Sequence, residues 1–259
     1  VLATGGFEWD EELKTTFLRG PLTSPASPPT NTGDGLKMAL TAGAGLGNMT
    51  SAWWIPTLSE SGARWPDNGA PEKDAQRSVP VLIERTLPHS LMVNGQGKRF
   101  CNEATNYSAL AGAFHSFDPA TYGYNNLPAY LIVDSQYRGR YPIASVMPGN
   151  PSPDWIAEAP DLAGLAAAIG VDAAQLEATV SRFNTHAENV NDPDFGRGVS
   201  AYDRFYGDRS RDGAAATLGK VEVGPFFAVR IDLGALGTNG GPRTNGLAQV
   251  LNVYGDIIP

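Results

Sequence analysis

The chain has 259 residues, of which 42% are hydrophobic and 18% charged, a composition typical of a globular protein with a sizeable core. Its 19 basic and 27 acidic side chains give a net charge of −8, which disfavours binding to nucleic acid or to an anionic membrane surface. Its apolar runs, such as residues 162–169, are far shorter than the roughly 20 residues of a membrane-spanning helix.

Cysteine and histidine are scarce. The single cysteine, Cys101, excludes an internal disulfide and a thiolate-rich metal site. The three histidines are scattered, which disfavours a structural zinc site. This balance predicts a reducing compartment, and we expect a cytoplasmic protein.

Both ends of the chain have the pattern of structured sequence. Residues 1–4 predict a buried strand that leads into a glycine turn, and residues 250–259 predict a hairpin that stops just after its second strand. A secretory signal would need a basic start and a longer apolar stretch. We therefore expect this chain to be a piece of a longer protein.

The first third predicts two helices and a long loop. Residues 10–18 predict a helix with an acid-rich start, which suits the helix dipole. Residues 20–31 contain four prolines among Ser and Thr and predict a loop. Residues 36–44 predict a second helix that is ended by glycines. The polar residues 59–78 predict a linker or lid.

From residue 79 onward the pattern changes to short strands. Residues 80–83 predict one strand, and residues 90–93 predict a hairpin with residues 99–101 across an Asn-Gly-Gln-Gly turn. Residues 129–134 predict a further strand, and residues 225–230 predict one that leads to a glycine cluster.

Two helices are predicted between these last strands, at residues 161–169 and 173–188. Asp172 is expected to cap the second helix, with Gln175 as its capping-box partner. Leu176, Val180 and Phe183 recur at helical spacing and predict the buried stripe of that helix. The whole pattern predicts an α+β protein in which the middle of the chain is inserted between two flanking fragments of another domain.

Two glycine motifs are candidate nucleotide contacts. The nearest approach to Gly-x-Gly-x-x-Gly, at residues 43–48, has Asn48 in place of the third glycine and follows a helix rather than a strand. Residues 4–6 (Thr-Gly-Gly) and 32–35 (Thr-Gly-Asp-Gly) are better placed, at a strand end and a helix start where backbone N–H groups face outward. Taken alone, each motif is more often a plain turn than a nucleotide contact.

Four segments resemble one family, in the family's own order. They are residues 1–7 (VLATGGF), 32–39 (TGDGLKMA), 92–103 (MVNGQGKRFCNE) and 236–241 (LGTNGG). Together they are similar to the FAD-dependent fumarate reductase and 3-ketosteroid dehydrogenase flavoproteins. The resemblance implies a mixed α/β cap domain, which binds the substrate, between two fragments of a Rossmann-type FAD-binding domain. The boundaries are then 1–66, 67–236 and 237–259.

The resemblance also implies cofactor contacts and argues against one substrate. The FAD contacts would be Thr4, Gly5, Gly6, Thr32, Gly33, Asp34 and Gly35. Fumarate reductases place cationic side chains at three positions where this sequence has Ile55, Tyr107 and Gly237. A dicarboxylate such as fumarate is therefore disfavoured.

Tyr107 is the catalytic residue that the resemblance implies. In 3-ketosteroid dehydrogenases the matching tyrosine takes the proton from C2 of the steroid, while flavin N5 takes the hydride from C1. Trp53, Trp54 and Phe114 are the candidates to line the substrate side for a small apolar ketone or steroid. The electron acceptor is not indicated.

Two alternatives stay open. The first keeps the flavin but makes the protein an enone or fumarate-type reductase. The second belongs to another class: an isolated cap fragment without FAD or activity. Such a fragment would form a homo-oligomer through surfaces that the FAD-binding domain normally covers.

Overall fold

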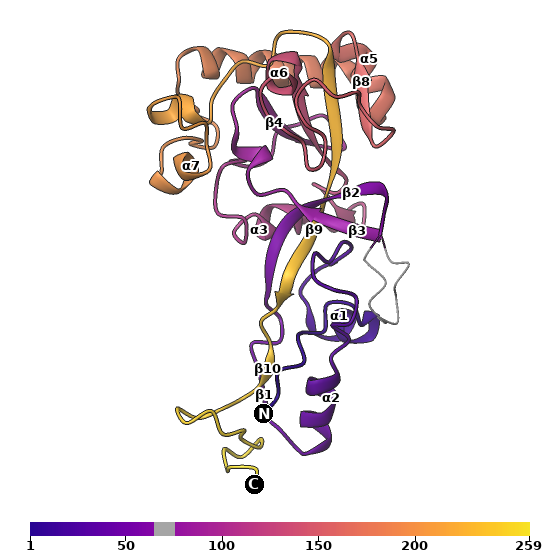
Figure 1. The fold of residues 1–259 in the computed structure, drawn as a ribbon, viewed down its shortest axis with the longest axis vertical. Coiled ribbons are helices and arrows are strands. Elements are labelled where there is room, and N and C mark those ends of the chain that lie inside the picture. Colours follow the sequence, from indigo (N-terminus) through magenta and orange to yellow (C-terminus); the bar gives the residue numbers. More distant parts are fainter. Residues whose placement is uncertain (65–75) are drawn as a thin grey trace.

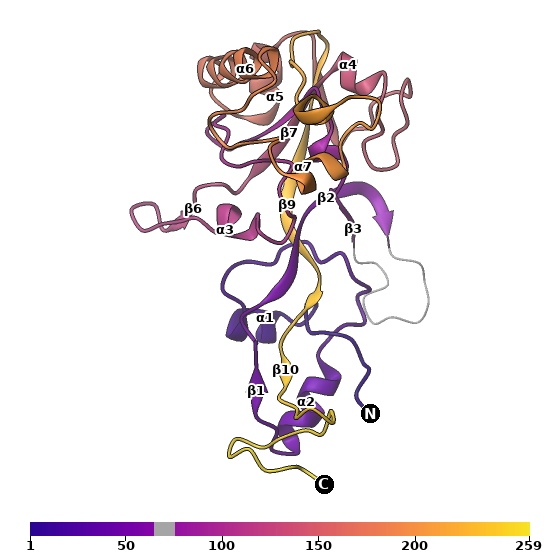
Figure 2. The same cartoon turned by 90° about the vertical axis from the view of Figure 1, so that its left-hand side faces the viewer.

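The computed structural model describes residues 1–64 and 76–259 (Figure 1). The molecule is elongated, with most helices and strands gathered at one end and both chain termini at the other (Figures 1 and 2). Within the described residues, no helix is both long and apolar enough to cross a bilayer.

A six-stranded antiparallel sheet forms the centre of the molecule. Its order is β3-β2-β9-β7-β4, and β8 pairs with β9 as well. The strands are β2 (Ala52–Arg64), β3 (Gln76–Pro80), β4 (Ser90–Asn94), β7 (Ala129–Asp134), β8 (Ile156–Ala159) and β9 (Phe226–Thr238). The first half of β9 pairs with β7 and β8, and its second half pairs with β2. This long strand therefore connects the two ends of the molecule (Figure 2).

Short helices and strand pairs complete the fold. The helices are α1 (Glu11–Phe17), α2 (Asp34–Thr41), α3 (Ala111–Phe114), α4 (Ser135–Arg138), α5 (Leu162–Ile169), α6 (Ala173–Glu188) and α7 (Ala201–Phe205), with 3-10 turns η1 (Glu84–Thr86) and η2 (Gly213–Ala216). Two small antiparallel pairs lie outside the main sheet: β1 (Leu46–Gly47) with β10 (Gly241–Pro242), and β5 (Phe117–Asp118) with β6 (Gly123–Tyr124).

The part of the sheet formed by β4, β7, β8 and the first half of β9 is buried on both faces. One face packs against α5 and α6, where Leu176, Val180 and Phe183 contribute to a buried cluster as their spacing predicts. The other face packs against Phe114 and Tyr137 in a second cluster. Burial of a large apolar side chain is worth about 1.5–3 kcal/mol, so these two layers hold the sheet in place.

The four predicted helices are confirmed as α1, α2, α5 and α6. In α1 and α6 the capping residue directly precedes the helix in sequence, so the start of the helix can be predicted locally. Asp10 accepts a hydrogen bond from the Leu13 amide at 2.8 Å and begins α1. Asp172 accepts one from the Gln175 amide at 2.7 Å and begins α6. The Gln175 side chain donates to Thr179 instead, so the reciprocal half of the expected capping box is not formed.

Several strand predictions are wrong because pairing is decided by distant segments. Residues 1–4 form no strand. The expected hairpin of residues 90–93 with 99–101 is reduced to a single bridge between Val93 and Arg99, since β4 takes β7 as its partner. Residues 81–83 lie beyond the end of β3.

The expected linker at residues 59–78 lies partly outside the described residues, at 65–75. Its flanks belong to β2 and β3, so they are strand rather than linker. β2 and β9 run through the junction between the two ends of the molecule. The domain boundaries at 66/67 and 236/237 stay a prediction.

Candidate functional site

Two of the predicted cofactor segments lie against each other. The Gly33 amide donates to the Gly6 carbonyl at 3.0 Å. The Gly35 amide donates to Thr4 Oγ1, also at 3.0 Å. Gly33 is the N-cap of α2, so the Thr-Gly-Gly turn crosses the start of this helix. The structure thus brings residues 4–6 and 32–35 together, as the two motifs required.

A third segment joins them from the end of β9. Glu8 is fully buried, and one of its carboxylate oxygens accepts a hydrogen bond from the Thr238 amide at 3.3 Å. The other oxygen accepts one from the Asn31 side chain at 2.6 Å. Thr238 Oγ1 in turn accepts from the Phe7 amide at 3.1 Å. Sequence reasoning missed Glu8, because the local pattern does not show that this carboxylate is buried against Asn31 and Thr238.

Two of the glycines are required by their surroundings. A Cβ on Gly6 would lie 2.2 Å from Glu8 Oε2 and 2.3 Å from Thr238 Oγ1. Gly33 has a φ of +77°, in the left-handed region that side-chain-bearing residues seldom adopt. Glycine at these two positions therefore lets the chain segments of this junction pack closely against one another.

A cavity of about 310 Å³ lies at this junction. It is lined by residues 2–7, by Gly35 and Leu36, and by residues 240–242. Asp34 is exposed beside it and accepts a hydrogen bond from Thr32 Oγ1 at 3.1 Å. Glycine backbone, a helix start and hydroxyl side chains suit the phosphate and ribose parts of a dinucleotide. The residues present therefore fit part of an FAD molecule.

Tyr107 lies elsewhere, in a tight turn that leads into α3. The turn starts at Asn102, whose carbonyl accepts from the Thr105 amide at 3.2 Å, and the Asn106 carbonyl accepts from the Ala109 amide at 3.1 Å. The Tyr107 side chain is half-buried. The phenol is therefore anchored on ordered backbone yet partly accessible.

Glu103 holds the inner side of this turn. It is fully buried and accepts hydrogen bonds from Arg99 at 2.7 Å, Arg197 at 3.1 Å and the Met92 amide at 3.1 Å. Burial works to raise the pKa of Glu103, but the two guanidinium groups outweigh it and hold that pKa below its usual value. Glu103 is thus a charged structural anchor rather than a proton donor.

Arg85 supports the same turn from η1. It is fully buried, and its Nη1 donates to the carbonyls of Glu103 and, at 2.9 Å, of Thr105. Its Nε donates to the Val81 carbonyl at 3.0 Å. Burial lowers the pKa of Arg85 to about 10. Nothing in the sequence pattern indicated this residue.

The three predicted substrate-side rings do not share one cavity among the described residues. Trp53 is 59% exposed, whereas Phe114 is fully buried against Phe100, with ring centroids 5.3 Å apart. Trp54 is buried edge-on to His115 at 4.8 Å and lines a cavity of about 490 Å³ with polar residues 48, 50 and 51. Of the three rings, Trp54 is the one that lines this cavity.

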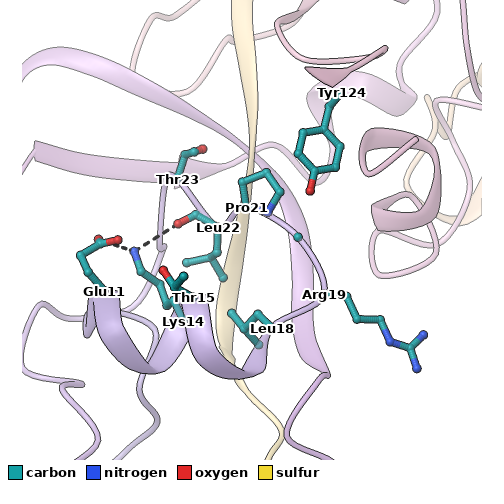
Figure 3. Close-up of a pocket in the computed structure, with 10 residues that line it drawn as sticks. Glu11, Lys14, Thr15, Leu18, Arg19, Pro21, Leu22, Thr23 and Tyr124 are labelled. Carbon is teal, nitrogen blue, oxygen red and sulfur yellow. Dashed lines mark hydrogen bonds and ion pairs between the residues drawn. The ribbon is translucent and has the colours of Figure 1, made fainter. Parts of the chain in front are cut away.

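Figure 3 shows a further cavity, of about 600 Å³, beside α1. Lys14 there donates to Glu11 at 2.5 Å and to the Leu22 carbonyl at 3.2 Å. The Arg19 guanidinium points away from this pair in Figure 3. Because the Lys14 charge is already paired, this cavity adds no residue to the candidate site.

The junction of residues 4–6, residues 32–35 and the end of β9 suits a nucleotide cofactor, and comparison with known families names the cofactor. The FAD binding domain family matches residues 1–259. The chain belongs to this family, and FAD is its cofactor. The resemblance drawn from the four sequence segments is confirmed.

Curated relatives divide into ketone dehydrogenases and fumarate reductases. The chain is 44% identical to 4-oxocyclohexanecarboxylate 2-dehydrogenase of Sinomonas cyclohexanicum, over 98% of this chain and 43% of that protein. It is 39% identical to 3-oxosteroid 1-dehydrogenase of Mycolicibacterium smegmatis, over 100% of this chain and 44% of that protein. A fumarate reductase (cytochrome) of Shewanella frigidimarina is 27% identical over 100% of this chain. The chain spans less than half the length of these relatives.

A solved structure shares the fold over nearly the whole chain. It is a 3-ketosteroid Δ1-dehydrogenase from Sterolibacterium denitrificans in complex with 1,4-androstadiene-3,17-dione. The TM-score is 0.86 at 34% identity, covering 98% of this chain and 44% of that one. The fold described above is therefore a mixed α and β arrangement of the FAD-dependent dehydrogenase type.

Proposed function

We propose that this chain forms part of an FAD-dependent dehydrogenase that introduces a double bond next to a ring ketone. The observation that carries the proposal is the chemistry shared by its relatives. In 4-oxocyclohexanecarboxylate 2-dehydrogenase and in 3-oxosteroid 1-dehydrogenase, the named position is β to the ketone of a six-membered ring. One site geometry serves both reactions, so the substrate class is a cyclic ketone rather than a particular steroid.

Tyr107 is the proposed base. A ketone acidifies the hydrogens on its α-carbon, and a tyrosine oxygen accepts one of them as a proton when the phenol is ionised. FAD, when bound, supplies the acceptor for the hydride that leaves the β-carbon. The electron pair of the α-C–H bond becomes the new C=C bond, so atoms and electrons balance.

FAD would be held by the glycine junction. Residues Thr4, Gly5, Gly6, Thr32, Gly33, Asp34 and Gly35 are the proposed contacts. Four of them, Thr4, Gly5, Gly6 and Gly35, line the cavity, whose lining residues all lie outside 67–236. This supports the proposed division into two FAD-binding fragments around a cap of residues 67–236. Of the proposed substrate-side rings, Trp54 is the best supported, because it lines a cavity.

Reduction of fumarate is the weaker alternative. Ile55, Tyr107 and Gly237 supply no cation for a dicarboxylate. The fumarate reductase relative is also less similar than the ketone dehydrogenases, at 27% identity against 44% and 39%. Reduction of an enone is the reverse of the proposed step and differs only in the direction of electron flow.

The proposal is tested by assaying the flavin-loaded holoenzyme that carries this chain. It is given a 3-ketosteroid or 4-oxocyclohexanecarboxylate together with an artificial electron acceptor. We expect formation of the conjugated enone from at least one of them. The matching alcohols, which lack an acidified α-hydrogen, should not react. Turnover of neither ketone, or turnover of fumarate alone with a reduced dye, would overturn the proposal.

A further inference from the structure

The turn that carries Tyr107 depends on one buried cation. Arg85 Nη1 binds the carbonyls of Glu103 and Thr105, which lie four and two residues before Tyr107. Through these bonds η1 reaches the backbone of the turn directly. Glu103, by contrast, grips the turn through its side chain.

Arg85 is an unusual choice for a purely structural position. It forms no ion pair within the described residues, and its Nη2 is buried there without a hydrogen-bond partner. Burying a cation without a counterion costs free energy, and an apolar side chain of similar size would fill the space at lower cost. What the guanidinium adds is two directed hydrogen bonds to carbonyls of the Tyr107 turn.

The other side of the turn is closed by α7. The Tyr202 hydroxyl is buried and lies beside the backbone of Tyr107. Thr86 Oγ1 donates to the Tyr206 carbonyl at 2.8 Å and so ties η1 to the end of α7. η1 and α7 therefore enclose the Tyr107 turn as one unit.

We propose that Arg85 is a positioning residue for Tyr107. By binding the Glu103 and Thr105 carbonyls, it holds the turn so that the phenol is correctly placed to accept a proton. This inference rests on the proposed function, in which Tyr107 is the base. Displacing a reacting group by about 1 Å can lower the rate about 100-fold. Losing the two directed hydrogen bonds that hold the turn is therefore expected to lower kcat.

The test compares Arg85→Lys and Arg85→Gln with Arg138→Lys in the flavin-loaded holoenzyme. Each replacement at Arg85 keeps a donor for one of the two carbonyls. Arg138 is a matched control, because it is also buried, also has unpartnered nitrogens and also binds a carbonyl, that of Asn150 at 2.9 Å. We expect kcat to fall by about 10- to 100-fold in the Arg85 variants with KM changed less than about twofold. Arg138→Lys should change neither.

Combination with Tyr107→Phe separates positioning from general damage. If Arg85 acts through Tyr107, adding Arg85→Lys to Tyr107→Phe should lower kcat by less than about threefold further. Hydrogen exchange gives a readout without turnover: amides of residues 102–107 should exchange faster in Arg85→Lys than in Arg138→Lys.

The outcomes distinguish this inference from the proposed function. If Tyr107→Phe retains full turnover, the base assignment is wrong and the positioning role falls with it. If Tyr107→Phe loses turnover but Arg85→Lys keeps normal kcat, or its effect multiplies with that of Tyr107→Phe, only the positioning role is overturned. If both Arg85 variants fail to fold or to retain flavin, Arg85 is a stability residue and the inference is wrong.

Discussion

At the scale of single residues, the turn that carries Tyr107 is held by charged side chains that form ion pairs with one another. Glu103 stays ionised between Arg99 and Arg197. Tyr107 differs from these groups because it is half-buried and sits on a supported turn rather than inside an ion-pair cluster. It is therefore the side chain of this turn that is best placed to exchange a proton.

Tyr107→Phe is expected to lower kcat of the flavin-loaded holoenzyme by about 100- to 10,000-fold, the usual contribution of a general base. The ring stays and only the hydroxyl is lost, so flavin content and thermal stability should not change. Tyr130→Phe, at a half-buried tyrosine of β7, is the control and should retain turnover. A Tyr107→Phe enzyme with near-normal kcat would mean that another group takes the proton.

At the scale of elements, α6 shows how local signals and packing agree. Its limits, Ala173 and Glu188, are those predicted from the sequence, since an N-cap and an apolar stripe lie within the helix itself. The stripe then supports the β4, β7 and β9 layer by contact with α5 and the sheet. The pattern of a strand, by contrast, does not show which strand pairs with it, because the partners are far away in sequence.

Asp172→Ala is expected to destabilise the protein by about 1 kcal/mol, because the Gln175 amide at the start of α6 loses its acceptor. Urea unfolding of the variant and the parent would measure this as a lower midpoint with an unchanged slope. Asp154→Ala is a suitable control, because Asp154 is exposed and forms no hydrogen bond within the described residues. An equal loss in both variants would show that the cap contributes nothing specific.

At the scale of the whole molecule, the cofactor junction is assembled from segments more than 200 residues apart. The end of β9 reaches residues 4–6 and the turn at Glu8 because β9 runs from the end where most strands gather toward the end that holds the termini (Figure 1). The segments pack closely at position 6, where a Cβ would lie within 2.3 Å of the Glu8 and Thr238 side chains.

Gly6→Ala is therefore expected to weaken FAD binding by at least about tenfold, or about 1.4 kcal/mol, because the new Cβ pushes Glu8 and Thr238 apart. Visible flavin absorbance after removal of free FAD would measure the retained cofactor. Gly246→Ala is the matched control, since a Cβ there meets nothing within 4 Å. Retention of FAD by Gly6→Ala at the parent level would place the cofactor away from this junction.

Elements that depend on interactions between residues close in sequence could be predicted, whereas contacts between distant residues could not. Helices α1 and α6 and strand β7 were predicted because their patterns lie within a few residues. The glycine motifs were found as separate turns, and the resemblance implies that they are cofactor contacts. Glu8 and Arg85 were missed, because a buried charge has no sequence signature until its partners are known.

The sequence by itself determined helices α1, α2, α5 and α6, the membership in an FAD-binding family and the positions of the glycine turns, since each is read from segments of residues close together in the chain. Only the tertiary structure decided which turns meet, that β9 pairs with β2, β7 and β8 together, and that Arg85 lies under the Tyr107 turn. The physical reason is that strand pairing and buried-charge contacts join residues far apart in sequence, and such contacts are set by the packing of the whole chain.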